Sequence, residues 1–238
     1  DLLRIMTMNS NFSYIDENLK KIRYNINEAV AKYRRPDESV RLMAVTKTVA
    51  PEAVNYAISK GIDLIGENRV QEYQSKKDFY DKSAEVHIIG HLQTNKVKYI
   101  INSVSMIQSV DSIKLAEEIN RLALQNNRIM NVLCEVNIGR EESKSGVMPE
   151  EAFEFAEKLG EFKNIKVCGL MAVPPAENSE KFLCEMQNLY IDISEKKSDN
   201  INMDILSVGM TGDYVNAIKY GSTLVRIGSG LFGARIYK

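Results

Sequence analysis

Two basic residues stand at the ends of short apolar runs, where they could take part in chemistry. Lys47 follows the run 42–45, and Arg226 lies within the run 224–227. A deprotonated lysine amine is a nucleophile that condenses reversibly with aldehydes. An arginine enclosed by β-branched neighbours needs a partner for its charge. Taken alone, Lys47 would most simply be a solvated surface lysine, but two cations at one place indicate a site for an anionic ligand.

Two glycine-rich segments near the C-terminal end carry hydroxyl side chains. Gly-Met-Thr-Gly-Asp occupies 209–213, and Gly-Ser-Gly occupies 228–230. Segments of this composition that precede a helix are typical of phosphate-binding loops, because glycine lets backbone N–H groups approach an anion closely. Thr211 and Ser229 could equally be helix N-caps and nothing more.

Short β-rich or apolar runs alternate with helical patterns along the whole chain. We predict strands at 42–45, 62–65, 86–89, 106–110, 132–136, 165–171, 205–208 and 224–227. Strands that alternate with helices favour a parallel sheet. Eight such units in 238 residues predict an α/β fold of the (β/α)8 TIM-barrel type, and an open doubly wound sheet is the alternative.

An additional helix is predicted before the first strand, because apolar residues recur at helical spacing from Ile15 to Tyr33. No linker or shift in composition divides the chain. We therefore expect one domain over residues 1–238 and no second domain.

The barrel prediction brings the candidate residues together. Active-site residues of such barrels lie at the C-terminal ends of the strands, and phosphate is usually held by the loops after strands 7 and 8. Lys47 and Arg226 would then lie on the neighbouring first and eighth strands, at the mouth. The two glycine-rich segments follow the seventh and eighth strands.

Composition excludes several classes of protein. The 31 basic and 32 acidic residues give a net charge of −1, so the basic excess of a nucleic-acid binder is missing. No apolar stretch is long enough to span a membrane, and we expect a cytoplasmic protein, with a monomer as the default. The three cysteines form no CxxC pair and are expected to be small buried hydrophobes. His87 and His91 are too few for an HExxH metal site, so we expect no metal and a structural role for both.

Six segments, in this order, resemble those of one family. They are 44–47 (AVTK), 66–69 (GENR), 87–96 (HIIGHLQTNK), 169–171 (GLM), 209–213 (GMTGD) and 221–233 (GSTLVRIGSGLFG). The family is that of the pyridoxal phosphate homeostasis proteins, single-domain relatives of the alanine racemase barrel. The resemblance runs from about residue 13 to the end. By the family pattern we would expect Ser at position 211, Thr at 229 and Ala at 230, where this sequence has Thr, Ser and Gly.

The resemblance implies that Lys47 carries pyridoxal 5′-phosphate (PLP) as an internal aldimine. It implies that Arg226 faces the pyridine nitrogen of PLP and that Asn68 contacts the ring or a substituent. A guanidinium only donates hydrogen bonds and stays protonated, so it disfavours a proton on the ring nitrogen and weakens the cofactor as an electron sink.

The resemblance also implies a set of phosphate ligands. These are the hydroxyls of Thr211 and Ser229 and backbone N–H groups around Met210 and Gly228. Lys144, in the segment after the fifth predicted strand, is more simply a solvated loop lysine than a residue of the mouth.

The function that the resemblance implies is PLP binding in intracellular vitamin B6 homeostasis and delivery, with PLP-dependent apo-enzymes as expected recipients. Efficient catalysis is not expected, since alanine racemases take a second proton-transfer group, a tyrosine, from a second domain. The alternatives are a low-activity PLP-dependent amino-acid racemase and a barrel aldolase that uses Lys47 on a phosphorylated sugar.

Overall fold

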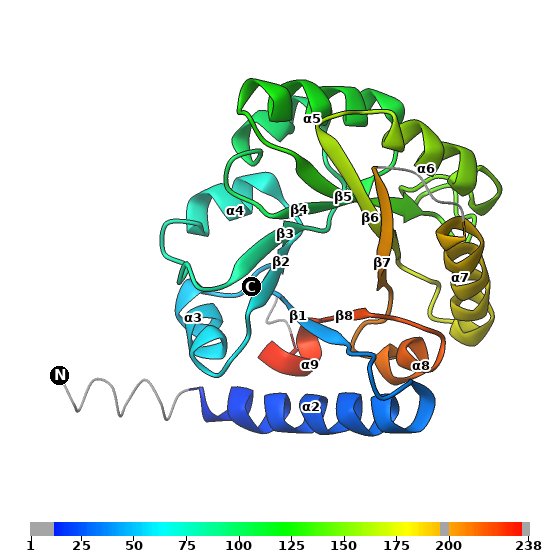
Figure 1. Cartoon of the computed structure of the whole chain (residues 1–238). Coiled ribbons are helices and arrows are strands. Elements are labelled where there is room, and N and C mark those ends of the chain that lie inside the picture. The colour runs from blue at the N-terminus through cyan, green and yellow to red at the C-terminus, as the bar shows by residue number, and fades with distance from the viewer. Residues whose placement is uncertain (1–11, 196–199, 235–238) are drawn as a thin grey trace.

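Parallel strands close into a barrel in the computed structural model, which describes residues 12–195 and 200–234. Each strand pairs with the next along the chain, and β8 pairs back with β1 (Figure 1). The strands are β1 Arg41–Val45, β2 Leu64–Glu67, β3 Glu85–Ile88, β4 Met106–Val110, β5 Met130–Val136, β6 Ile165–Ala172, β7 Ile201–Ser207 and β8 Leu224–Ile227. The predicted barrel is confirmed, and the open sheet is wrong.

Helices surround this barrel (Figure 1). They are α2 Ser13–Tyr33, α3 Pro51–Ser59, α4 Val70–Lys76, η1 Thr94–Tyr99, α5 Ile113–Gln125, η2 Pro149–Glu151, α6 Ala152–Gly160, α7 Ser179–Ser194, α8 Tyr214–Lys219 and α9 Ser229–Phe232, where η marks a 3-10 helix. The connection after β3 is thus a 3-10 helix. The helix after β8 is a single turn of four residues.

The predicted N-terminal helix is α2, which packs against α8 and α9. Its inward face is buried at Ile15, Leu19, Ile22, Ile26 and Ala29. Tyr33 was predicted to extend this face but is 40% exposed, and its ring lies 4.9 Å from the Lys32 ammonium. At the last residue of the helix the apolar face has therefore given way to solvent.

Along the axis of the barrel, one layer of interior side chains is apolar and another is polar. Apolar clusters inside it include Met43 and Leu224 near β1 and β8, and Leu133 of β5. The next residue of β5, Cys134, belongs instead to the core between barrel and helices. Because strand side chains alternate, Glu135 faces the barrel interior as Leu133 does.

Composition predicted buried cysteines and no membrane-spanning segment. Cys134 and Cys168 are buried, but Cys184 is exposed, because α7 turns Leu183 and Met186 inward and leaves Cys184 on its outer face. In the described residues, no helix has the length and apolar character needed to cross a membrane.

Candidate functional site

Arg226 is buried inside the barrel and bonded to neutral oxygens. Its Nη1 donates to the carbonyl and hydroxyl oxygens of Ser207 at 2.7 and 2.6 Å, and its Nη2 donates to the Ala172 carbonyl at 2.8 Å. These bonds engage three of the five N–H donors of a guanidinium. Within residues 12–195 and 200–234, no carboxylate forms an ion pair with it.

This environment leaves a positive charge without a contacting counter-charge. Burial lowers the pKa of Arg226 to about 10, although Asp213 and Glu135 raise it from a distance. A guanidinium with that pKa is still protonated at neutral pH. Arg226 was expected to need a partner for its charge, and the groups that contact it are neutral carbonyl and hydroxyl oxygens. The interior of the barrel therefore remains attractive to an anion.

Lys47 follows β1 in a turn that is tied to the wall of the barrel. Next to it, the buried Thr46 hydroxyl donates to Glu67 Oε1 at 2.7 Å and lies 3.2 Å from the Gly66 carbonyl oxygen. The Tyr80 hydroxyl donates to the same Glu67 oxygen. Burial raises the pKa of Glu67, although both hydroxyl bonds lower it. Glu67 therefore joins the end of β1 to the segment between α4 and β3.

The other side of Lys47 is held by α4. The Thr48 N–H donates to Glu72 Oε1 at 2.5 Å, Lys76 pairs with Glu72, and Lys76 Nζ donates to the Thr46 carbonyl at 3.2 Å. Thr48 has a φ of 63°, a left-handed conformation that is costly for a β-branched residue. Contacts on both sides thus determine the course of the chain through Lys47.

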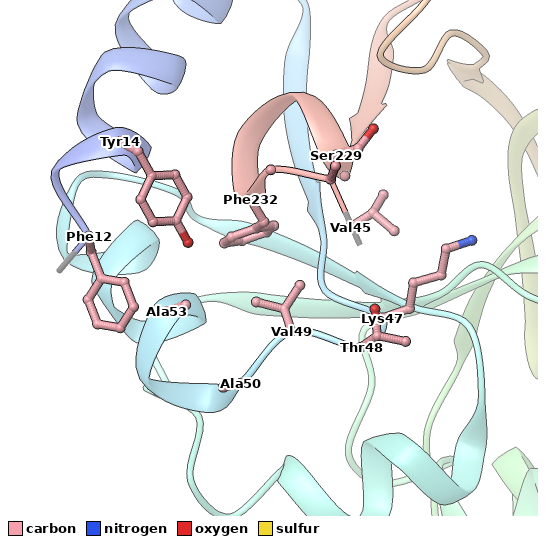
Figure 2. Close-up of a pocket in the computed structure, with 13 residues that line it drawn as sticks. Phe12, Tyr14, Val45, Lys47, Thr48, Val49, Ala50, Ala53, Ser229 and Phe232 are labelled. Carbon is pink, nitrogen blue, oxygen red and sulfur yellow. The ribbon is translucent and has the colours of Figure 1, made fainter. Parts of the chain in front are cut away.

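A cleft of about 340 Å³ opens beside this turn. Figure 2 shows Phe12, Tyr14 and Phe232 at one end of it, and the half-buried Lys47 with its amine pointing away from them. The cleft is lined by three of the predicted site residues, Lys47, Gly228 and Ser229. The structure therefore brings the first and eighth strand ends together, as the barrel prediction required.

The two predicted hydroxyl residues lie side by side. Ser229 Oγ is 3.5 Å from Thr211 Oγ1, and the Gly230 N–H donates to Thr211 Oγ1 at 3.1 Å. A Cβ on residue 230 would lie 2.9 Å from Thr211 Cγ2. The methyl group that distinguishes Thr from the expected Ser at 211 thus occupies the space that the expected Ala at 230 would need. The two departures from the family pattern compensate each other.

Three other residues considered from the sequence lie outside the lining of the cleft. The Met210 N–H donates to Asp213 Oδ1 at 2.7 Å, so it is already engaged in this structure. Asn68 directly follows β2 and is half-buried, and its backbone packs so closely on Gly90 that a Cβ there would lie 2.4 Å from the Asn68 oxygen. Lys144 is exposed. Neither Asn68 nor Lys144 lines the cleft.

Glu135 is a residue that the sequence reasoning missed. It is 8% exposed and faces the barrel interior near the end of β5. The Ser145 hydroxyl donates to its Oε1 at 3.0 Å, while Oε2 has no hydrogen-bond partner in the part of the chain that the structure describes. Burial raises its pKa to about 7, although Ser145 and Arg226 lower it. A charged residue inside an apolar strand was the signal that singled out Arg226, and the same signal was present here.

Known proteins match this chain over most of its length. The family model "Alanine racemase, N-terminal domain" matches residues 18–236. The pyridoxal phosphate homeostasis protein of Aquifex aeolicus is 40% identical over 226 residues, which cover 93% of this chain and 98% of that one. The chain belongs to the pyridoxal phosphate homeostasis protein family.

Solved structures agree with this family membership. PipY of Synechococcus elongatus PCC7942, solved with PLP bound, is 26% identical with a TM-score of 0.77 over 92% of this chain and 100% of that one. An alanine racemase of Clostridium difficile 630 is 18% identical with a TM-score of 0.74, over 94% of this chain but 57% of the racemase. At that identity the racemase shows the shared barrel fold alone.

Proposed function

We propose that this member of the family binds PLP and serves in vitamin B6 homeostasis, with Lys47 holding the cofactor as an aldimine. The names of its relatives and the PLP-bound PipY structure support the ligand. The observation that carries the proposal for this chain is the buried Arg226, which forms no ion pair within the described residues and lies next to the strand that leads to Lys47.

The residues present fit the three reactive parts of PLP. The Lys47 amine suits the aldehyde, the paired hydroxyls of Thr211 and Ser229 suit the phosphate, and the two remaining N–H donors of Arg226 suit the pyridine nitrogen. The Met210 N–H can join the phosphate ligands once it leaves Asp213.

Arg226 also favours holding the cofactor over catalysis. Bound PLP supplies an electron sink for the carbon next to an attached amine. A guanidinium bonded to the ring nitrogen cannot give it a proton as a carboxylic acid can, so the sink is weak. We therefore propose storage and delivery without efficient catalysis. The expected recipients, the monomeric state and the cytoplasmic location stay predictions.

The test of this function is to locate the cofactor. Protein purified or incubated with PLP is reduced with borohydride, digested and analysed by mass spectrometry. We expect a yellow protein whose adduct maps to the peptide that contains Lys47. The Lys47→Arg variant should lose the adduct, and Lys158→Arg, at an exposed lysine on α6, should retain it.

Each alternative gives another result. A colourless protein without an adduct contradicts the proposal. Trapping that requires a phosphorylated sugar and shows no visible absorbance beforehand indicates an aldolase. Loss of an α-deuteron from amino acids at a rate above that of free PLP indicates a racemase.

A further inference from the structure

A chain of buried polar side chains crosses the barrel interior from Arg226. Arg226 Nη1 donates to Ser207 Oγ at 2.6 Å, and the Ser207 hydroxyl lies 2.8 Å from Gln108 Oε1. Gln108 Nε2 is 2.9 Å from His87 Nδ1. The four residues belong to β8, β7, β4 and β3, and none is more than 3% exposed.

The hydrogen bonds of this chain all run in one direction. A guanidinium can only donate, so Ser207 Oγ accepts from Arg226 and its own proton goes to Gln108 Oε1. The Gln108 amide then donates to His87 Nδ1, which leaves the imidazole proton on Nε2, 3.7 Å from Glu85 Oε2. In this arrangement each of the three hydrogen bonds between Arg226 and His87 has one donor and one acceptor.

Charged groups lie near His87 at the opposite end of the barrel. Glu85 begins β3 and takes a hydrogen bond from Arg41 at 2.9 Å and one from Ser105 at 3.1 Å. Its interaction with His87 comes first among the causes that lower the pKa of Glu85 to about 2. The chain thus runs from Arg226 to His87, whose Nε2 lies 3.7 Å from the Glu85 carboxylate at the N-terminal end of the strands.

We propose that Gln108 and His87 are positioning residues of the ligand site: they hold the Arg226 guanidinium so that its two remaining N–H donors face the pyridine nitrogen of PLP. The proposal rests on the proposed function for the identity of the ligand. The arrangement itself is a property of the protein without PLP.

The position of Arg226 depends on this chain because few other contacts restrain it. Besides Ser207, the Ala172 carbonyl on β6 is the only acceptor of an Arg226 side-chain hydrogen bond within residues 12–195 and 200–234. Without Gln108, the Ser207 hydroxyl would lack a buried acceptor and would turn toward another oxygen, which would alter the Nη1 bond. A neutral His87 is also required, because a protonated imidazole donates from both nitrogens and cannot accept from Gln108.

The surroundings keep His87 neutral at physiological pH. Burial lowers its pKa, Glu85 on the same strand raises it, and Arg41 of β1 lowers it again. Acidification through that lowered pKa would break the bond from Gln108. We therefore expect the spectrum of bound PLP to change in an acidic range that the Gln108→Leu variant no longer shows.

The experiment compares Gln108→Leu with Ser109→Ala, its neighbour on β4, whose buried hydroxyl has no hydrogen-bond partner. In the PLP-free protein, ¹⁵N NMR of His87 should show an unprotonated Nδ1, and Gln108→Leu should shift that signal. With PLP added, Gln108→Leu should bind about tenfold more weakly and absorb at a different wavelength, since contacts of this kind contribute on the order of tenfold each. Ser109→Ala should match the wild type.

The outcomes separate this inference from the proposed function. If the wild type binds no PLP, the proposed function fails, yet the NMR measurement still tests the chain. If a folded Gln108→Leu keeps the wild-type affinity, spectrum and pH profile, the positioning role is refuted. Should Gln108→Leu fail to fold, His87→Asn, which shortens the acceptor, takes its place for the affinity, the spectrum and the pH profile.

Discussion

Two glutamates buried near the ends of strands differ in what surrounds them. Glu67 lies on the outer side of β2, since its neighbour Gly66 faces Met43 inside the barrel. Glu135 lies on the inner side of β5. Burial raises the pKa of both, and among residues 12–195 and 200–234 neither Oε2 has a hydrogen-bond partner.

Their remaining contacts give them different tasks. Glu67 accepts two hydroxyl bonds, from Thr46 and Tyr80, and so holds the strand that leads to Lys47. Glu135 accepts one, from Ser145. Burial raises the pKa of Glu67 while its two hydroxyl bonds lower it, whereas the pKa of Glu135 is about 7 and is lowered in part by the charge of Arg226. The side of the sheet on which each glutamate lies thus determines whether it supports the end of β1 or faces the interior of the barrel.

The largest effect is expected from removing the outer glutamate. Glu67→Ala leaves two buried hydroxyls without their acceptor and opens a cavity, which should cost about 4 kcal/mol of unfolding free energy. Glu67→Gln should cost less, about 1 kcal/mol, because the amide oxygen can still accept both hydroxyl bonds and fills the same space. Urea unfolding at pH 7 measures both. Equal losses in the two variants would mean that the acceptor at position 67 does not hold the end of β1.

The inner glutamate should make stability depend on pH. Its folded pKa of about 7 lies above the ordinary value of 4.5, so the folded state holds a proton that the unfolded state releases. Its contribution is complete below about pH 4.5 and is lost as the pH rises to about 7. Glu135→Gln should remove this dependence and raise stability above pH 7 by about 3 kcal/mol.

Urea unfolding of the wild type and Glu135→Gln at pH 5 and pH 8 measures this difference. Glu67→Gln is the matched control, since it makes the same substitution at the buried glutamate on the outer side of the sheet. Parallel pH profiles for the wild type and Glu135→Gln would contradict the titration of Glu135.

The smallest effect is expected at Thr48, in the turn between β1 and α3. Thr48→Gly should stabilise the fold by about 1 kcal/mol, because glycine adopts the left-handed conformation without strain. Thr48→Ala keeps a Cβ and should gain little. Thermal unfolding of both variants tests this, and an equal gain from alanine would show that the backbone of Thr48 is unstrained.

Much of the fold could be predicted because its signals are local. Apolar runs that alternate with helical patterns indicated the barrel, and strands 4 and 8 were placed at their observed bounds. Side-chain alternation and barrel closure were enough to bring Lys47 and Arg226 to neighbouring strand ends. Strand 2 was predicted two residues early, since 62–65 holds three apolar residues and the observed Leu64–Glu67 only two.

The partners of the buried polar groups could not be predicted in this way. Ser207 and Gln108 are 99 residues apart, and Arg226 and the Ala172 carbonyl are 54 apart. The sequence by itself determined the period of each element, the alternation of side chains along each strand and the family to which the chain belongs. Only closure of the barrel decided which neutral oxygens surround Arg226 and which glutamate faces the interior, because those contacts join strands that no local pattern connects.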